Sequence, residues 1–180
     1  VRGATFRVPA GRRRGESLHV STDTTNHQPP RYLLSDADLG EEEALAVADV
    51  VRGKWLSVGQ QTADFEAEFA AAVGSDHAVA TSSATASLHL AMLALGIGPG
   101  DEVLVPSYTF VASVNAIAYV GATPVFVDIG GPTDLNLDPA DLAAKVSPRS
   151  RAIVVVHLAG YFADMNSIMD LADRHGLAVV

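Results

Sequence analysis

The sequence of 180 residues contains no cysteine. Disulfide bonds, zinc–thiolate sites and a cysteine nucleophile are therefore excluded, and the absence fits a reducing cytoplasm, where we expect the protein to act. Long apolar runs are also missing, since none approaches the roughly 18 residues that a membrane span requires. The first residues show no apolar core of a secretory signal, so we expect no membrane partner.

Positively charged residues are scarce. Lysine and arginine together number 12, against 21 aspartates and glutamates, which gives a net charge of −9. Six of the arginines lie within residues 1–31, so the rest of the chain is strongly acidic. An acidic surface repels phosphate backbones, and we therefore expect no nucleic-acid partner. Residues 1–30 are polar and arginine-rich and predict a disordered tail, whereas residues 31–180 predict a folded domain.

From residue 41 onward, helix-like and strand-like segments alternate. Helices are predicted at residues 41–53, 62–74 (with Thr62 as N-cap), 84–95, 109–120, 163–176 and after the Asp138–Pro139 pair, and strands at 77–81, 102–106, 123–128, 151–157 and 177–180. The strand segments are continuously apolar, which is typical of parallel strands covered on both sides. We therefore predict an α/β fold of three layers, a mostly parallel sheet with helices on both faces. Because the last apolar strand stops at Val180, we expect an incomplete domain.

Two short segments invite a ligand-binding interpretation. GIGPGDEV (96–103) is rich in glycine but follows a helix and opens a strand, the reverse of a dinucleotide-binding loop, so it predicts a turn. TSSATAS (81–87) lies between a predicted strand and a predicted helix. Unpaired N–H groups and the helix dipole at such a point can bind a phosphate without a charged side chain. An ordinary helix cap remains the alternative at this point.

Aromatic residues and histidines add weaker signals. PSYTF (106–110) follows the next strand, so Tyr108 or Phe110 could stack on a planar ring over the same crevice, or could belong to the core. His157 ends a strand and could reach the crevice, whereas His89 lies within an apolar helix. No two histidines have the spacing of a metal site, and no metal is expected.

The motifs SSATASLH, GDEVLVPSYTFVAS, GATPVFVD and VHLAG, in this order, resemble the sugar-nucleotide aminotransferases of the DegT/StrS type. These enzymes have the aspartate-aminotransferase fold and use pyridoxal 5'-phosphate (fold type I). The resemblance covers about residues 40–180. It implies that Ser83, Ala84 and Thr85 bind the cofactor phosphate and that Phe110 stacks on the pyridine ring. It also implies that the loop carrying Trp55, Leu56, Ser57 and Gly59 helps to form the sugar-nucleotide site.

The same resemblance implies a reaction. An amino group passes from glutamate or glutamine to a nucleotide-linked keto-sugar, in the biosynthesis of deoxyamino-sugars, polysaccharides or antibiotic sugars, and the intact enzyme is a homodimer. The only lysines are Lys54 and Lys145, and neither lies in the family's lysine motif. The Schiff-base lysine is therefore expected beyond Val180, no catalytic residue is assigned in this chain, and the chain alone is expected to be inactive. Two alternatives stay open: a deoxysugar dehydratase of the same fold, and a non-catalytic truncated or regulatory product.

Overall fold

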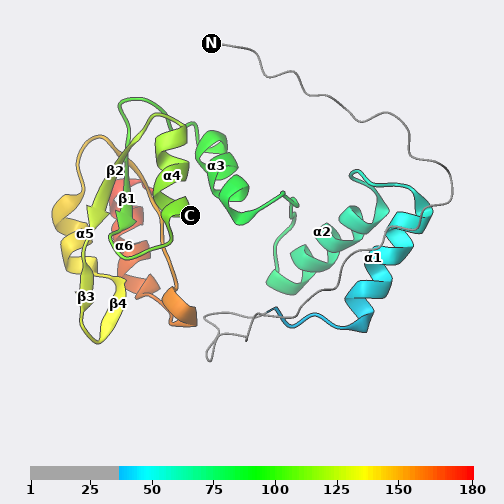
Figure 1. Cartoon of the computed structure of the whole chain (residues 1–180). Coiled ribbons are helices and arrows are strands. Elements are labelled where there is room, and N and C mark those ends of the chain that lie inside the picture. Colours follow the sequence, from blue (N-terminus) through cyan, green and yellow to red (C-terminus); the bar gives the residue numbers. More distant parts are fainter. Residues whose placement is uncertain (1–36) are drawn as a thin grey trace, which may run out of the picture. The chain divides into compact units, whose positions relative to one another are not determined.

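The computed structural model describes residues 37–180, so the predicted tail at residues 1–30 lies outside the described residues. The chain divides into two compact units, with the boundary between Leu56 and Ser57. In the first unit, helix α1 (Glu41–Gly53) has the bounds that the sequence predicted (Figure 1). Its first turn carries three glutamates, and the Gly40 N–H donates to Glu43 Oε2 at 2.7 Å. Negative charge at this end of the helix is favoured by the helix dipole.

The second unit begins with helix α2 (Gln60–Val73). The prediction that Thr62 caps this helix is wrong. Gly59 is the N-cap, and the Thr62 N–H donates to the Gly59 carbonyl at 3.1 Å, so Thr62 already lies in the first turn. The helix ends at Val73, and Gly74 follows it as a C-cap in the left-handed conformation. No helix within residues 37–180 is both long enough and apolar enough to cross a bilayer.

A four-stranded parallel sheet forms the centre of this unit. Its strands are β1 (Glu102–Pro106), β2 (Thr123–Val127), β5 (Ser150–Ile153) and β6 (Ala178–Val179), in the order β2-β1-β5-β6. All five residues of β1 are buried, as expected for a central strand with neighbours on both sides. The continuous apolar runs in the sequence therefore correctly predicted parallel pairing.

Helices cover the sheet on both faces. Val103 and Val105 of β1 pack into a cluster with helices α3 (Ala84–Ala94) and α4 (Val111–Tyr119). Leu104, which points to the other face, packs with helices α5 (Pro139–Lys145) and α6 (Met165–His175). Each fully buried side chain of this size contributes roughly 1.5–3 kcal/mol of transfer free energy. The predicted three-layer α/β fold is confirmed.

Two predicted strands are corrected by the structure, and one hairpin was not predicted. Residues 77–81 form no ladder with any described strand, and the N–H of Ala80 instead donates to a side chain, Glu66 Oε1, at 2.8 Å. The strand predicted at 151–157 ends at Ile153, and a 3₁₀ turn, η1 (Leu158–Gly160), follows. An antiparallel hairpin of β3 (Ile129–Gly131) and β4 (Asp134–Leu137) was not predicted. Ladder pairing joins segments that are distant in the sequence, so a local pattern of apolar residues cannot fix where it starts or stops.

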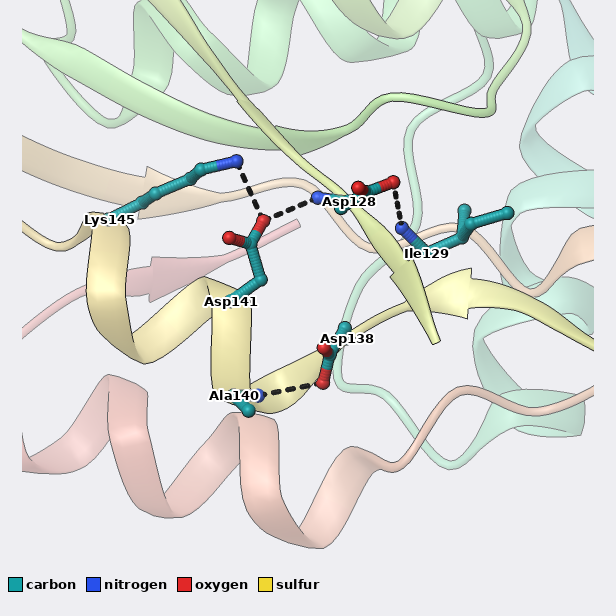
Figure 2. A network of polar contacts seen from close by, with 6 residues as sticks. All are labelled: Asp128, Ile129, Asp138, Ala140, Asp141 and Lys145. Carbon is teal, nitrogen blue, oxygen red and sulfur yellow. Dashed lines mark hydrogen bonds and ion pairs between the residues drawn. The ribbon is translucent and has the colours of Figure 1, made fainter. Parts of the chain in front are cut away.

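The end of β2 is fastened to helix α5 by a carboxylate. Figure 2 shows Asp141 Oδ2 accepting the Asp128 N–H at 2.6 Å and the Lys145 ammonium at 2.7 Å. The bond from the Asp128 N–H, and after it the bond from Lys145, hold the pKa of Asp141 below its ordinary value. The predicted cap of α5 is confirmed, since Asp138 Oδ1 accepts the N–H of Ala140 at 2.9 Å.

The glycine-rich segment at 96–103 is a turn, as its context predicted. The Gly98 N–H donates to Asp101 Oδ2 at 3.0 Å, and the Asp101 N–H donates to the Gly98 carbonyl at 3.1 Å. The turn closes directly onto β1, so the segment connects α3 to the sheet and lies at the amino edge of the strands. A dinucleotide site at this segment is thereby excluded, because ligands of such sheets bind at the opposite, carboxyl edge.

Candidate functional site

Helix α3 starts with a side-chain cap. Ser83 is the N-cap, its backbone is extended (φ −169°, ψ 159°), and its Oγ accepts the Ala86 N–H at 3.2 Å. Capping by serine satisfies one of the N–H groups that a helix start leaves unpaired. The ordinary cap that the sequence left open is therefore present.

The cap leaves two further donors. No hydrogen-bond acceptor within residues 37–180 is found for the N–H groups of Ala84 and Thr85. Ala84 is exposed and Thr85 is half-buried. Two adjacent N–H groups at the positive end of an eleven-residue helix form a site that suits a phosphate or carboxylate. The cap and the candidate anion site thus use different donors of the same helix end.

A network of hydroxyl groups holds the loop before this helix. Thr81 Oγ1 donates to the Ser83 carbonyl at 3.0 Å, and Thr81 Oγ1 and Ser87 Oγ lie 2.6 Å apart. A hydroxyl has one proton, so when Thr81 donates to Ser83, Ser87 must donate to Thr81. The hydroxyl proton of Ser83 is not needed for these bonds, because Ser83 Oγ only accepts from Ala86. Ser83 therefore keeps a third donor beside the two N–H groups.

The aromatic candidate, Phe110, is the N-cap residue of α4 and is 75% exposed. Tyr108, two residues earlier, is 55% exposed. Neither side chain therefore belongs to the core, which was the alternative that the sequence left open. The loop that carries them is anchored at both ends: the Ser107 N–H donates to the Val127 carbonyl at 2.7 Å, and Thr109 Oγ1 lies 2.9 Å from Ser113 Oγ.

The starts of α3 and α4 lie at the same edge of the sheet. Each helix leads through a short connection to the amino end of a strand, α3 to β1 and α4 to β2, and the two helices contact each other (Figure 1). Both helices therefore begin at the carboxyl edge of the parallel strands, where ligands of such sheets bind. The structure thus brings the helix start at Ser83–Thr85 and the Phe110 loop to one side of the molecule.

The residues predicted for the sugar-nucleotide loop lie on both sides of the boundary that divides the chain into the two units. Trp55 and Leu56 end the first unit and are 67% and 74% exposed, and Ser57 opens the second unit. Gly59 caps α2, with an extended backbone. Exposed apolar side chains such as Leu56 are available for a ligand or a neighbouring surface. The role of these four residues stays a prediction.

Two of the residues considered as candidates are held by internal contacts. His157 Nδ1 accepts the Ala163 N–H at 3.2 Å, and the ring lies edge-on to Phe162 with centroids 5.2 Å apart. Lys145 is paired with Asp141. No pattern in the sequence pointed to the buried Asn136, whose Oδ1 accepts the Leu158 N–H at 3.1 Å and so holds the loop after β5. A buried amide that bonds to distant backbone can be recognised only once the fold is known.

These features define a class of protein. The protein is an α/β protein, because a parallel sheet lies between two helical layers. Its candidate ligand site lies at the carboxyl edge of the sheet, where the unpaired donors and the exposed aromatic are found. Residues 37–180 match the DegT/DnrJ/EryC1/StrS aminotransferase family. The chain belongs to this family, which confirms the resemblance found in the sequence motifs.

Individual relatives agree with this membership. The chain is 49% identical over 142 residues to the spore coat polysaccharide biosynthesis protein SpsC of Bacillus subtilis, a match that covers 79% of this chain and 36% of SpsC. It is 45% identical over 152 residues to GDP-perosamine synthase of Caulobacter vibrioides, which covers 84% of this chain and 41% of the synthase. The chain therefore spans less than half the length of these relatives.

The solved structure of DesV from S. venezuelae superposes with a TM-score of 0.73 at 46% identity. This match covers 77% of the present chain and 37% of DesV. Identity at this level extends the likeness beyond the shared fold.

Proposed function

We propose that this chain forms part of a pyridoxal-phosphate-dependent aminotransferase that acts on a nucleotide-linked keto-sugar, with glutamate or glutamine as amino donor. The observation that carries the proposal is the pair of unpaired N–H groups at Ala84 and Thr85, on the same sheet edge as the exposed Phe110, in a member of an aminotransferase family. The donors suit a phosphate and the aromatic suits a flat ring. Pyridoxal 5'-phosphate has both parts in one molecule.

Each residue would have a separate task. The N–H groups of Ala84 and Thr85 and the Ser83 hydroxyl would hold the phosphate, and the Phe110 ring would lie against the pyridine ring and exclude water from it. Trp55, Leu56, Ser57 and Gly59 would contact the sugar nucleotide. When bound, pyridoxal phosphate supplies an electron sink for chemistry at the carbon that bears the amino group.

The names of the relatives support the substrate class. One takes part in polysaccharide biosynthesis and the other is a synthase of GDP-perosamine. These names do not favour the dehydratase alternative or a non-catalytic product. The absence of cysteine is compatible with the cytoplasmic location that we propose for the protein.

A proline substitution tests the phosphate site directly. In Ala84→Pro, the first helical residue loses its N–H, while proline fits that position because the preceding Ser83 is already extended. Loss of one hydrogen bond to a charged group predicts a cofactor affinity about ten- to a hundredfold weaker, measured by equilibrium dialysis of pyridoxal 5'-phosphate. Glu41→Pro, at the first position of α1, is the matched control and should bind as the wild type does. Equal affinity of a folded Ala84→Pro variant would reject the site.

The proposed homodimer has a candidate surface on α3 and α4. Leu90, Leu93 and Tyr119 are between 50% and 58% exposed, and His89 packs edge-on to Tyr119 at 5.5 Å between centroids. Exposed apolar side chains on two contacting helices suit burial against a second subunit. Light scattering of the purified protein should give twice the mass of one chain, and Leu93→Glu should shift the mass towards that of the monomer. A monomeric wild type would contradict the proposal.

A further inference from the structure

The side chain of Glu66 joins helix α2 to the segment that leads into the candidate phosphate site. Its Oε1 accepts the N–H of Ala80 at 2.8 Å, across 14 residues of sequence. Both residues are half-buried and both lie in the second unit. Because residues 77–81 form no ladder with any described strand, this side-chain bond supplies the backbone with a partner that a sheet would otherwise provide.

The bond connects directly to the hydroxyl network. Ala80 precedes Thr81, whose Oγ1 donates to the Ser83 carbonyl and meets Ser87 Oγ at 2.6 Å. Ser83 in turn precedes the two unpaired N–H groups at the start of α3. Two hydrogen bonds, from Ala80 to Glu66 and from Thr81 to Ser83, together with the covalent chain, thus link the Glu66 carboxylate to the proposed phosphate donors.

The surroundings of Glu66 favour a strong bond. Glu66 lines a groove of about 510 Å³, whose lining also includes Phe65, Phe69, Ser83 and Ala84. A carboxylate that accepts a backbone N–H forms a charge-assisted bond, and partial burial reduces the competition from water. A carboxylate is also repelled by a phosphate, so Glu66 is unsuited to be a phosphate ligand itself.

We propose that Glu66 is a positioning residue for the cofactor phosphate. It fixes Ala80 and, through Thr81, sets the loop so that the N–H groups of Ala84 and Thr85 are presented together. The inference rests on the proposed function, because it assumes that a phosphate binds at α3. It adds a residue on another helix that controls the site without touching the ligand.

The experiment compares three substitutions in the intact protein of which this chain forms part. Glu66→Ala removes the acceptor, Glu66→Gln keeps an acceptor oxygen at the same place, and Glu68→Ala is the matched control on the exposed side of the same helix. For each variant, equilibrium dialysis gives the affinity for pyridoxal 5'-phosphate, and hydrogen exchange gives the protection of the amides from Ala80 to Thr85. Thermal unfolding without cofactor reports the stability of each variant separately.

Glu66→Ala should weaken the affinity by up to about tenfold, because loss of one hydrogen bond lowers the fraction of loop in the binding geometry. The amide of Ala80 should exchange faster in the same variant. Glu66→Gln should lose less affinity than Glu66→Ala, since it restores an acceptor oxygen but not the charge that strengthens the bond. Glu68→Ala should match the wild type in both measurements.

Two results would overturn the proposal. The first is wild-type affinity in a folded Glu66→Ala protein, and the second is a loss in Glu66→Gln as large as in Glu66→Ala, which would show that the charge matters and not the bond. If Glu66→Ala does not fold, Thr81→Val interrupts the same path one step later and must give the same tenfold loss, while retained affinity rejects the path. An intact wild-type protein that binds no pyridoxal 5'-phosphate would instead reject the proposed function, and the inference with it.

Discussion

Replacing Asp141 with alanine should loosen the end of β2 by an amount that can be estimated from its contacts. Asp141 accepts the Asp128 N–H at 2.6 Å and the Lys145 ammonium at 2.7 Å (Figure 2). The first bond joins a charged acceptor to backbone and is worth about 1.5 kcal/mol, the low end of its class, because Asp128 is exposed and water can replace the acceptor. The second is an i,i+4 pair on a helix surface, worth about 0.3–0.5 kcal/mol. The expected loss is about 2 kcal/mol, or a melting temperature lower by about 4–8 °C.

The pH dependence gives this prediction a second test. The Asp128 N–H, and after it Lys145, hold the pKa of Asp141 below its ordinary value. A group whose pKa is lower in the folded state than in the unfolded chain stabilises the fold at pH values above its unfolded pKa, about 3.9 for aspartate. This contribution disappears as the pH falls through the folded pKa. The difference in melting temperature between the wild type and Asp141→Ala should therefore be constant above about pH 5 and narrow below about pH 4.

The assay is thermal unfolding followed by circular dichroism between pH 3 and 7. Asp101 and Asp164 also have lowered pKa values, the first chiefly through the Gly98 N–H and the second chiefly through the Ser167 hydroxyl. The wild type should thus lose stability in acid for several reasons, and only the difference from the variant isolates Asp141. The control is Asp173→Ala, because Asp173 is an exposed acid in the last turn of α6. This substitution should change the free energy of unfolding by no more than about 0.5 kcal/mol. A gap that persists unchanged at pH 3 would refute the reasoning.

The remaining predictions concern the site and the turns that support it. Phe110→Ala should weaken pyridoxal 5'-phosphate binding by up to about tenfold through lost ring stacking. Because Phe110 is 75% exposed, the melting temperature without cofactor should stay within about 1 °C of the wild type. A large drop in melting temperature with normal affinity would contradict the role of Phe110 in the site. Ser83→Ala should cost about 1 kcal/mol of unfolding free energy through loss of the cap, measured in urea, and should also weaken cofactor binding; unchanged affinity would remove Ser83 from the site. Gly121→Ala should destabilise the fold by more than about 1 kcal/mol, because Gly121 has φ +77° and a Cβ there would lie 3.1 Å from Pro99 Cγ; a wild-type melting temperature would contradict this.

The layers of the fold could be predicted because each of them leaves a local trace in the sequence. Apolar runs such as 102–106 indicate buried parallel strands, and the Asp138–Pro139 pair indicates the helix start that the structure shows. The segment 77–81 has the same apolar character as the strands, yet it forms no ladder in the described chain. Strand formation needs a neighbour, and the sequence of one segment does not contain that information. The hairpin at 129–137 was missed because its glycines and proline interrupt the alternation of apolar and polar residues that indicates a strand.

The candidate site divides in the same way. The start of α3 could be predicted, since any helix leaves unpaired N–H groups at its first turn and the hydroxyl residues before it mark the cap. The exposure of Phe110 could not be predicted, because an aromatic beside an apolar helix packs inward or outward according to the neighbouring layers. The bond from Glu66 to Ala80 was also invisible, since it joins residues 14 apart in an order that follows no helical or strand period.

The hydrogen bond between Glu66 and Ala80 matters because the groove beside it is lined by no cationic side chain among the described residues. The groove that leads to the start of α3 is lined by apolar, hydroxyl, histidine and glutamate side chains, with neither lysine nor arginine among them. A flexible lysine can follow a phosphate that is slightly displaced, whereas backbone N–H groups point where the chain directs them. A site built mainly from backbone donors therefore depends on the conformation of the loop that carries them. Thr81, Ser87 and Glu66 fix that conformation through bonds within the protein, so their substitution should alter anion binding although none of them is proposed to contact the anion.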